Sequence, residues 1–287
     1  MTDSLPPVSR TALGVAGLRA TESGRPDRLF DDPYASLFFE AGKSLLPAPP
    51  QRAVAQGPDL RALFYSQVVV RTRFYDEYLT GAVAQGCAQV VLLAAGLDSR
   101  ALRLDWPASL RLFELDLPGV LEFKDRVLTE HGAVPRCTRV VVPVDLREDW
   151  ACALREAGFD PARPTAWLAE GLLIYLSFEE AAGLLGTVGE LSAPGGRIAF
   201  EHRADLANPL VSSAKLLERG RSVTDLWQGG LGKEDERWLA EHGWRPSTHV
   251  RPPLARERGG IQDEPHGFLT AIRAGSARTE RSGAGEP

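Results

Sequence analysis

Acidic side chains recur in this sequence at the points where short apolar runs end. The run in "VVLLAAGLDSR" leads to Asp98, and the next run, in "LRLFELD", ends on Asp116. The carboxyl ends of parallel strands meet at one edge of an open α/β sheet, and ligands bind there. Carboxylates grouped at that edge repel a pyrophosphate and attract a cation. The sequence therefore predicts an anionic rim of Asp98, Glu114, Asp116, Asp145, Glu170 and Glu201, with His202 beside it.

The turn after the first apolar run carries a single glycine, Gly96, whereas a dinucleotide-binding turn carries three. Asp116 follows about 20 positions later, near the spacing at which an acid accepts hydrogen bonds from a ribose. A ligand with a ribose, a positive charge and no phosphate fits this pattern, and S-adenosylmethionine has these properties. An NAD(P)-dependent oxidoreductase is the main alternative enzyme class, but the missing glycines and the acidic rim argue against it.

The composition narrows the class of protein further. The 287 residues carry a net charge of -5 with a pI near 5.7, whereas nucleic-acid-binding domains are typically basic. Three cysteines without CxxC spacing and five scattered histidines predict no metal site. No apolar run approaches the ~20 residues of a membrane span, and the N-terminus lacks a signal-peptide pattern. We therefore expect a cytoplasmic protein that acts on a small molecule, and the oligomeric state stays open.

From about residue 89 onward, apolar runs alternate with helical patterns. The runs are apolar throughout, which is typical of parallel strands that are covered on both faces. Two further strands are expected near 244–250 and 267–273, and Ser177 with Glu180 forms a capping-box pattern before a helix. This alternation predicts a doubly wound, Rossmann-like α/β sheet. Its first five strands are expected at 90–94, 110–115, 139–144, 165–169 and 197–201.

The chain divides into three parts by pattern and composition. Residues 1–86 are expected to form an N-terminal helical cap and lid, because they are largely helical in pattern apart from the proline-broken loop "LLPAPPQRAVAQGPD". Residues 87–275 are expected to form the α/β core. Residues 276–287 are polar and rich in glycine and serine, so we expect a disordered tail.

Several segments together resemble one known family. "VVLLAAGLDSRALRL", "FELDLPGVLEFKDRVL", "VPVDLREDW" and "WLAEGLLIYLSFEEAAGLL" resemble the leucine carboxyl methyltransferase family. The closest likeness is to its bacterial branch of S-adenosylmethionine-dependent O-methyltransferases, which includes polyketide carboxyl methyltransferases. The resemblance extends from about residue 9 to residue 273. It implies the class I methyltransferase fold, a mainly parallel sheet of seven strands whose last strand is inserted antiparallel.

The resemblance also implies roles for individual residues toward S-adenosylmethionine. The motif "RTR" supplies an arginine for the methionine carboxylate, either Arg71 or Arg73. Glu170 would lie near the ammonium or the sulfonium of the methionine moiety. The remaining cofactor contacts are assigned by matching motifs: Gly96 and Asp98 in the first turn, Asp116 at the ribose, Asp145 at the adenine amino group and the Leu146 backbone beside the ring.

Two positions depart from the family pattern. The first turn usually begins with a further glycine, where this chain has Ala94, so an added methyl group is expected to crowd the cofactor-binding backbone. The sequence "LDSR" replaces the commoner "LDTR", and the hydroxyl group is retained at Ser99. A binding-only or degenerate methyltransferase fold is therefore the non-enzymatic alternative.

The expected reaction is methylation of a carboxylate of a small molecule, such as a polyketide or another secondary metabolite. A carboxylate is ionised at neutral pH, so its methylation needs no general base. A hydroxyl acceptor would need one, and His202 is the candidate base, although a hydrogen-bonded structural histidine is the favoured interpretation of this residue. The expected catalytic group is Glu170, His202 and Tyr175, and the expected substrate contacts are Tyr175, Arg203 and Trp227.

Overall fold

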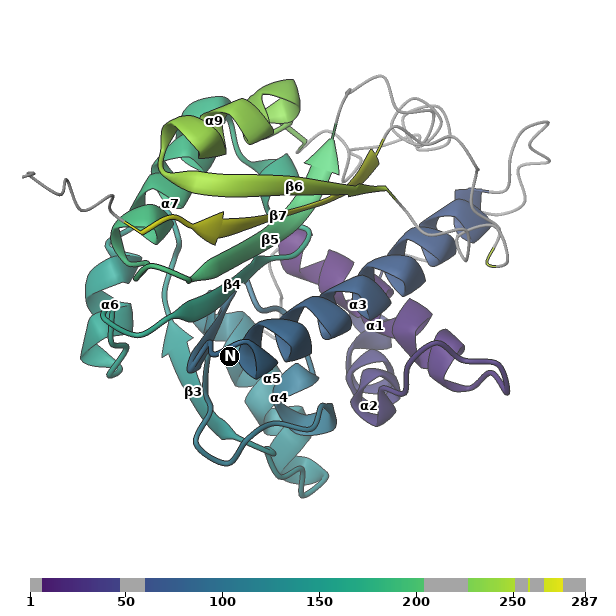
Figure 1. The fold of residues 1–287 in the computed structure, drawn as a ribbon. Helices are drawn as coiled ribbons and strands as arrows, with labels where there is room; N and C mark the ends of the chain where they lie inside the picture. Colours follow the sequence, from purple (N-terminus) through teal and green to yellow (C-terminus); the bar gives the residue numbers. More distant parts are fainter. Residues whose placement is uncertain (1–6, 47–59, 204–226, 251–257, 259–265, 276–287) are drawn as a thin grey trace, which may run out of the picture.

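The computed structural model describes residues 7–46, 60–203, 227–250, 258 and 266–275 (Figure 1). Most of the predicted lid loop, from residue 47 to residue 59, lies outside the described residues. The predicted tail at 276–287 also lies outside them.

A single seven-stranded sheet forms the centre of the molecule, in the order β3-β2-β1-β4-β5-β7-β6. The first five strands in the chain pair in parallel, and β7 runs antiparallel between β5 and β6. The predicted class I methyltransferase sheet, with its last strand antiparallel, is therefore confirmed. The strands are β1 (Gln89–Leu93), β2 (Arg111–Asp116), β3 (Thr138–Pro143), β4 (Thr165–Ala169), β5 (Arg197–Arg203), β6 (Trp244–Val250) and β7 (His266–Arg273).

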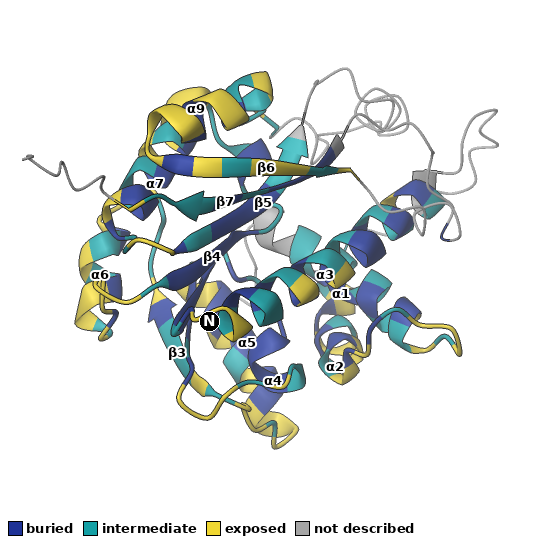
Figure 2. Ribbon diagram, viewed as in Figure 1, coloured by how far each residue is buried: buried dark blue, intermediate teal, exposed yellow. Residues whose placement is uncertain are grey.

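Helices cover both faces of the sheet, which explains why the central strands are apolar throughout. Every residue of β1 and β4 is buried (Figure 2). One face packs against α6 (Trp150–Glu156), α7 (Phe178–Glu190) and α9 (Asp235–Glu241). The other face packs against α3 (Leu60–Ala84). Both faces of the sheet are thus removed from water, and its carboxyl edge is left for ligands.

Short helices and caps connect the strands in the order that the sequence predicts. The capping box of Ser177 and Glu180 is present at the start of α7, with Ser177 Oγ accepting from the Glu180 N–H at 3.2 Å. The remaining helices on the α3 side are α4 (Arg100–Arg103) and α5 (Pro118–Glu130). Helix α4 follows β1 after the turn at 94–99, and α5 follows β2 almost at once, so the first residues of both helices lie at the carboxyl edge.

The N-terminal helices α1 (Pro7–Ser23) and α2 (Pro33–Gly42) pack on the core beside α5 (Figure 1). Leu13, Ala16 and Phe38 of these helices form one apolar cluster with Phe123 and Val127 of α5. Helix α3 contributes Tyr75 and Leu79 to the cluster that also contains strand residues. A division of the chain after residue 86 stays a prediction, because α3 serves both as cap and as a covering layer of the sheet. None of the helices within the described ranges is long and apolar enough to cross a bilayer.

Candidate active site

A cavity of about 1240 Å³ lies at the carboxyl ends of strands β1 to β5. Its walls come from the strand ends, from the first turn after β1 and from α1 and α3 above them. This is the place where open α/β sheets bind ligands. The cavity contains nearly all of the acidic rim that the sequence predicts: Asp98, Asp116, Asp145, Glu170 and Glu201 line it together.

The Gly96 turn is held against the end of β2 by Asp116. The Gly96 N–H donates to Asp116 Oδ2 at 2.6 Å, and the Leu117 N–H donates to Asp116 Oδ1 at 2.7 Å. Gly96 has a φ of +49°, which a residue with a side chain rarely adopts. Burial raises the pKa of Asp116, and the two backbone N–H groups only partly offset this effect. The turn and the carboxylate thus form one unit.

Ala94, at the start of the same turn, has a left-handed backbone with a φ of +54°. This conformation costs an L-residue roughly 1–2 kcal/mol. Replacing Ala94 with glycine is therefore expected to stabilise the fold by about 0.5–1 kcal/mol, after the entropy that glycine gains in the unfolded chain. Urea unfolding measures the change. The control is Ala95→Gly at the next, buried position, whose φ is not positive, and it should destabilise the fold by about 1 kcal/mol. Equal losses in both variants would contradict the strain at Ala94.

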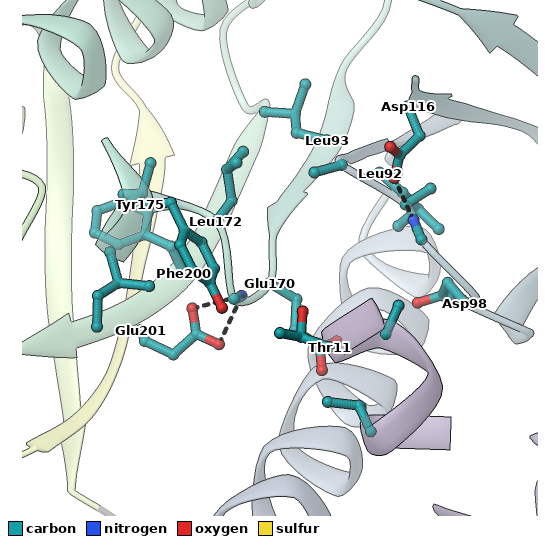
Figure 3. Close-up of a pocket in the computed structure, with 18 of the residues that line it drawn as sticks. Thr11, Leu92, Leu93, Asp98, Asp116, Glu170, Leu172, Tyr175, Phe200 and Glu201 are labelled. Carbon is teal, nitrogen blue, oxygen red and sulfur yellow. Dashed lines mark hydrogen bonds between the residues drawn. The ribbon is translucent and has the colours of Figure 1, made fainter. Parts of the chain in front are cut away.

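Arg71 of α3 lies between two carboxylates at the ends of β4 and β5. Its Nε donates to Glu170 Oε1 at 2.8 Å, and its Nη1 lies 3.3 Å from Glu201 Oε1. The Gly171 N–H donates to Glu201 Oε1 at 2.9 Å (Figure 3). Burial raises the pKa of Glu170, but Arg100 and Arg71 outweigh it and the net pKa is lowered. Glu201 has the opposite balance: burial and the nearby Glu170 leave its pKa raised although Arg71 lowers it.

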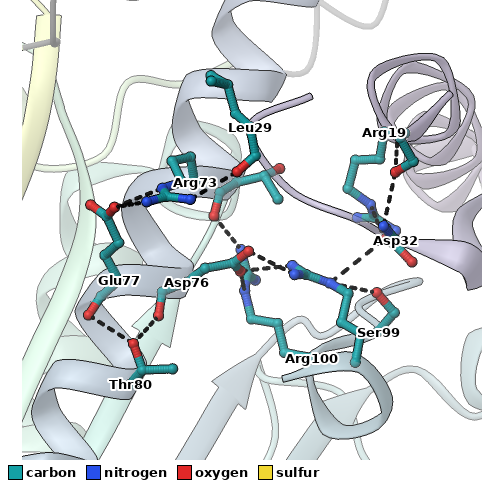
Figure 4. A network of polar contacts seen from close by, with 12 residues as sticks. Arg19, Leu29, Asp32, Arg73, Asp76, Glu77, Thr80, Ser99 and Arg100 are labelled. Carbon is teal, nitrogen blue, oxygen red and sulfur yellow. Dashed lines mark hydrogen bonds and ion pairs between the residues drawn. The ribbon is translucent and has the colours of Figure 1, made fainter. Parts of the chain in front are cut away.

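A buried arginine network, part of which Figure 4 shows, is joined to Arg71 through Glu170. Arg100 Nε donates to Asp76 Oδ1 at 2.7 Å, and its Nη1 contacts both Asp98 and Glu170, the latter at 2.8 Å. Arg103 also contacts Asp76, and Arg19 of α1 donates to the Leu97 carbonyl. The network joins α1, α3 and α4 to the first turn. The network therefore holds α1 and α3 in position over the carboxyl ends of the strands.

The structure distinguishes between the two arginines of the "RTR" motif. Arg73 is exposed, and it donates to the Leu29 carbonyl at 2.9 Å and to Glu77 at 2.6 Å. It does not belong to the cavity wall, whereas Arg71 does. Of the two alternatives, Arg71 is therefore the one placed to contact a ligand in the cavity, because two residues along a helix turn the side chain to a different face, and its role toward the cofactor stays a prediction.

Other predicted residues lie at the two ends of the cavity. Asp145 and Leu146 line the end near β3, where Arg147 donates to Asp145 Oδ1 at 2.9 Å and lowers its pKa. Tyr175 and Trp227 line the other end. These four predicted contacts therefore share one cavity but occupy different parts of it.

His202 does not line the cavity with Glu201. Its Nδ1 lies 2.7 Å from Oδ2 of the buried Asp235, and the hydrogen bond with Asp235 raises its pKa. Asp235 itself does line the cavity. The geometry favours the structural interpretation of His202 over its role as a base. Arg203 ends β5, and its side chain lies outside the described residues.

The sequence reasoning missed a set of cavity residues on α3. Phe64, Gln67 and Val68 line the cavity on the same helical face as Arg71. Residues spaced three and four apart lie on one face of a helix, so this spacing in the sequence could have predicted that they face the same way as Arg71. Asp76 and Arg100 were missed as partners, because nothing local shows that α3 and α4 meet.

Comparisons with known proteins agree with this geometry. The family model described as leucine carboxyl methyltransferase matches residues 12–189, more than half of the chain. A protein of Parafrankia sp. (strain EAN1pec), named as an S-adenosyl-L-methionine-dependent methyltransferase, is 48% identical over 93% of this chain and 87% of its own length. A protein of Mycobacterium tuberculosis with the same kind of name is 41% identical over 88% of each chain.

A solved structure from Thermobifida fusca YX, described as a methyltransferase, shares the fold. It has a TM-score of 0.53 and 18% sequence identity over 94% of this chain and 98% of that chain. This likeness concerns the fold alone, and the family rests on the sequence matches. On that basis the chain belongs to the leucine carboxyl methyltransferase family.

Proposed function

We propose that this protein transfers a methyl group from S-adenosylmethionine to a carboxylate oxygen of a small molecule, such as a polyketide or another secondary metabolite. The observation that carries the proposal is the single cavity in which the Gly96 turn, Asp116 and the Arg71–Glu170 pair lie together. The family and its named relatives support S-adenosylmethionine as the methyl donor. We propose a carboxylate as the acceptor for two reasons. The sequence resembles carboxyl methyltransferases, and an ionised carboxylate can be methylated without a general base.

The residues present fit S-adenosylmethionine. Each oxygen of a carboxylate has two acceptor positions, and each Asp116 oxygen accepts one backbone N–H, so one position on each is left for a ribose hydroxyl. Arg71 uses two of its groups on Glu170 and Glu201, and a guanidinium has further N–H donors for a methionine carboxylate. Glu170, whose pKa is lowered, is a carboxylate at neutral pH and can attract the ammonium or the sulfonium. Asp145 and Leu146, which line the end of the cavity near β3, are proposed to contact the adenine.

S-adenosylmethionine supplies a methyl group bound to a positively charged sulfur. The chain's own contribution is to orient the acceptor oxygen and to exclude water from the cavity, and such positioning lowers the barrier by several kcal/mol. An ionised acceptor carboxylate needs no proton removed. Tyr175 and Glu201 lie at the same end of the cavity and are proposed to face the acceptor (Figure 3).

A hydroxyl acceptor is the second candidate, because Glu201 lines the cavity and its pKa is raised. Such a carboxylate can accept a proton from a hydroxyl group while the oxygen is methylated. The two candidates are tested by measuring S-adenosylhomocysteine release with matched panels of aromatic and polyketide-like acids and the corresponding alcohols. Turnover of the alcohols alone would replace the carboxylate proposal with the hydroxyl one. Binding of NADH without binding of S-adenosylmethionine would overturn both.

Replacing Asp116 with alanine is expected to weaken S-adenosylmethionine binding by about 1–3 kcal/mol, because a charged hydrogen-bond acceptor for the ribose is lost. Isothermal titration measures the dissociation constant. The matched control is Asp105→Ala, since the Asp105 side chain is 95% exposed and lies outside the cavity wall. An unchanged affinity in the Asp116 variant would show that another group holds the ribose.

A further inference from the structure

The end of the cavity that Tyr175 lines, which we call the acceptor end, has a wall made of two segments. Residues 172–176 follow β4, and residues 227–232 come much later in the chain, before α9; both segments contribute to the cavity lining. The Gln228 N–H donates to the Ile174 carbonyl at 2.7 Å, which joins the two backbones. We call residues 227–232 the docked wall, because this pairing holds them against the segment after β4.

The docked wall can approach so closely only because residue 230 is a glycine. The Gly230 N–H donates to the Leu176 carbonyl at 2.9 Å, and Gly230 has a φ of +59°. A Cβ atom at this position would lie 2.7 Å from the carbonyl oxygen of Leu173, which is closer than real Cβ atoms come to another atom. The obstructing atom belongs to the backbone and cannot rotate away as a flexible side chain can. A side chain at position 230 must therefore push the docked wall away.

The other end of the docked wall is fastened to the sheet. The chain continues through a short 3-10 helix, Gly232–Glu234, into Asp235, which begins α9 and lines the cavity. Asp235 Oδ2 lies 2.7 Å from Nδ1 of His202 on β5. The docked wall is thus held at two points, one on the segment after β4 and one on β5.

Docking fixes the backbone around Tyr175. The carbonyls on either side of it, those of Ile174 and Leu176, accept hydrogen bonds from the docked wall. The Tyr175 carbonyl itself accepts one from Gln228 Nε2 at 3.0 Å. Tyr175 lines the cavity on the same side as Glu201 (Figure 3). The direction of the Tyr175 side chain into the cavity therefore depends on the docked wall.

The other proposed contacts are held by different elements. Glu201 accepts from the Gly171 N–H at 2.9 Å and pairs with Arg71 of α3. Asp98 and Asp116, which are proposed to contact the cofactor, lie on the opposite side of the cavity (Figure 3). A displacement of the docked wall should therefore move Tyr175 and leave the cofactor contacts in place.

We propose that the docked wall determines the specificity of the acceptor end, and that Gly230 positions this wall so that the Tyr175 hydroxyl donates a hydrogen bond to the acceptor carboxylate. The inference rests on the proposed function and deepens it by naming the group that recognises the acceptor. A carboxylate has two oxygens, so one can accept from Tyr175 while the other attacks the methyl group. Gly230 acts through Tyr175 and is a positioning residue.

The first test measures the binding of 4-phenylbutyrate by calorimetry to protein saturated with S-adenosylhomocysteine, which has no methyl group to transfer. We expect Gly230→Ala to bind this acid about tenfold more weakly, the size of one lost hydrogen bond to a charged group, with unchanged affinity for S-adenosylhomocysteine. The matched control is Gly132→Ala. Gly132 has a φ of +62°, a Cβ there would meet nothing within 4 Å, and it does not line the cavity.

Equal losses in the two glycine variants would refute the role of Gly230. A weaker affinity of Gly230→Ala for S-adenosylhomocysteine would overturn the separation of the docked wall from the cofactor contacts. Gln228→Leu removes the hydrogen bond to the Tyr175 carbonyl without a clash, and it should weaken 4-phenylbutyrate about threefold. Unchanged binding in this variant would also count against the docked wall.

The second test asks whether Gly230 acts through Tyr175. Tyr175→Phe should weaken 4-phenylbutyrate about tenfold, and adding Gly230→Ala to it should weaken binding by less than about twofold more, because the two residues serve one contact. A general structural loss would instead appear in full in the double variant, and that result would overturn the proposal.

The third test concerns the choice of acceptor. The wild-type affinities for benzoate, 4-phenylbutyrate and 6-phenylhexanoate should span at least about tenfold, and those of Gly230→Ala less than about threefold, because a displaced wall no longer limits the length that fits. An equal span in both proteins would refute the docked wall as the specificity element. If wild type saturated with S-adenosylhomocysteine binds none of the three acids, the inference fails together with the carboxylate acceptor. Failure of S-adenosylhomocysteine itself to bind would overturn the proposed function as a whole.

Discussion

Replacing Arg100 with methionine is expected to lower the free energy of unfolding by about 3–5 kcal/mol at pH 8. The side chain of Arg100 is 3% exposed and pairs with Asp76, Asp98 and Glu170. Methionine keeps much of the volume but leaves these carboxylates close together without their shared cation. Removal of one partner of a buried ion pair typically has a cost of this size. Urea unfolding followed by far-UV circular dichroism measures the loss.

The loss should depend on pH in a defined direction. Burial raises the pKa of Asp98, but Arg100 outweighs it and the net pKa is lowered. A lowered pKa in the folded state stabilises the fold above the unfolded pKa, near 4, and this contribution disappears as the pH falls through the folded value. Without Arg100, burial should raise the pKa of Asp98 above its ordinary value. A buried carboxyl group with a raised pKa destabilises the folded state as the pH rises and the group ionises. The difference between wild type and variant should therefore be larger at pH 8 than at pH 5.

Arg136→Met is the matched control, since the Arg136 side chain is 52% exposed and pairs with the exposed Asp105. Exposed ion pairs contribute about 0–1 kcal/mol. Two results would contradict the inference that the arginine network supports the site. One is an equal loss of stability in both variants, and the other is a loss at Arg100 that does not depend on pH. A selective loss at Arg100 would show that the cap helices depend on this buried cation for their position above the first turn.

Replacing Glu114 with methionine is expected to destabilise the fold by about 3–5 kcal/mol. Glu114 of β2 and Lys124 of α5 are fully buried, and Lys124 Nζ donates to Glu114 Oε2 at 2.7 Å. The substitution leaves the ammonium group of Lys124 buried without this carboxylate, and an uncompensated buried charge is costly. The free energy of unfolding in urea is again the measurement. Because α5 begins just after Asp116, this loss also tests how firmly that end of the site is held.

The double variant Glu114→Met with Lys124→Met should recover most of the loss, because it removes both charges and keeps an apolar core. Arg139 would retain Asp125, whose Oδ1 lies 2.8 Å from its Nη2. Glu40→Met is the exposed control, since Glu40 pairs with Lys43 at the surface and should cost under about 1 kcal/mol. A double variant as unstable as Glu114→Met alone would mean that shape, rather than charge, decides the effect.

Much of the fold could be predicted from the sequence, because its signals are local. A run such as Val90–Leu93 is apolar at every position, and this pattern indicates a strand that is covered on both faces. The capping box at Ser177 involves residues only three positions apart. Acids that follow parallel strands share an edge by the geometry of the sheet, so the presence of Asp116 and Glu170 in one cavity was also predictable.

The tertiary structure decided which faces of these elements meet. Arg71 and Arg73 are equivalent by motif, and only the packing of α3 on the sheet turns Arg71 toward Glu170. Glu201 and His202 are neighbours on β5, but strand alternation directs one to the cavity and the other to Asp235. Periodicity defines the faces of an element relative to one another, whereas the identity of the partner across each face depends on contacts between residues far apart in the chain. Packing therefore decided which face of each helix and strand meets its neighbours. That orientation places Arg71, Glu201 and Gln67 at the cavity.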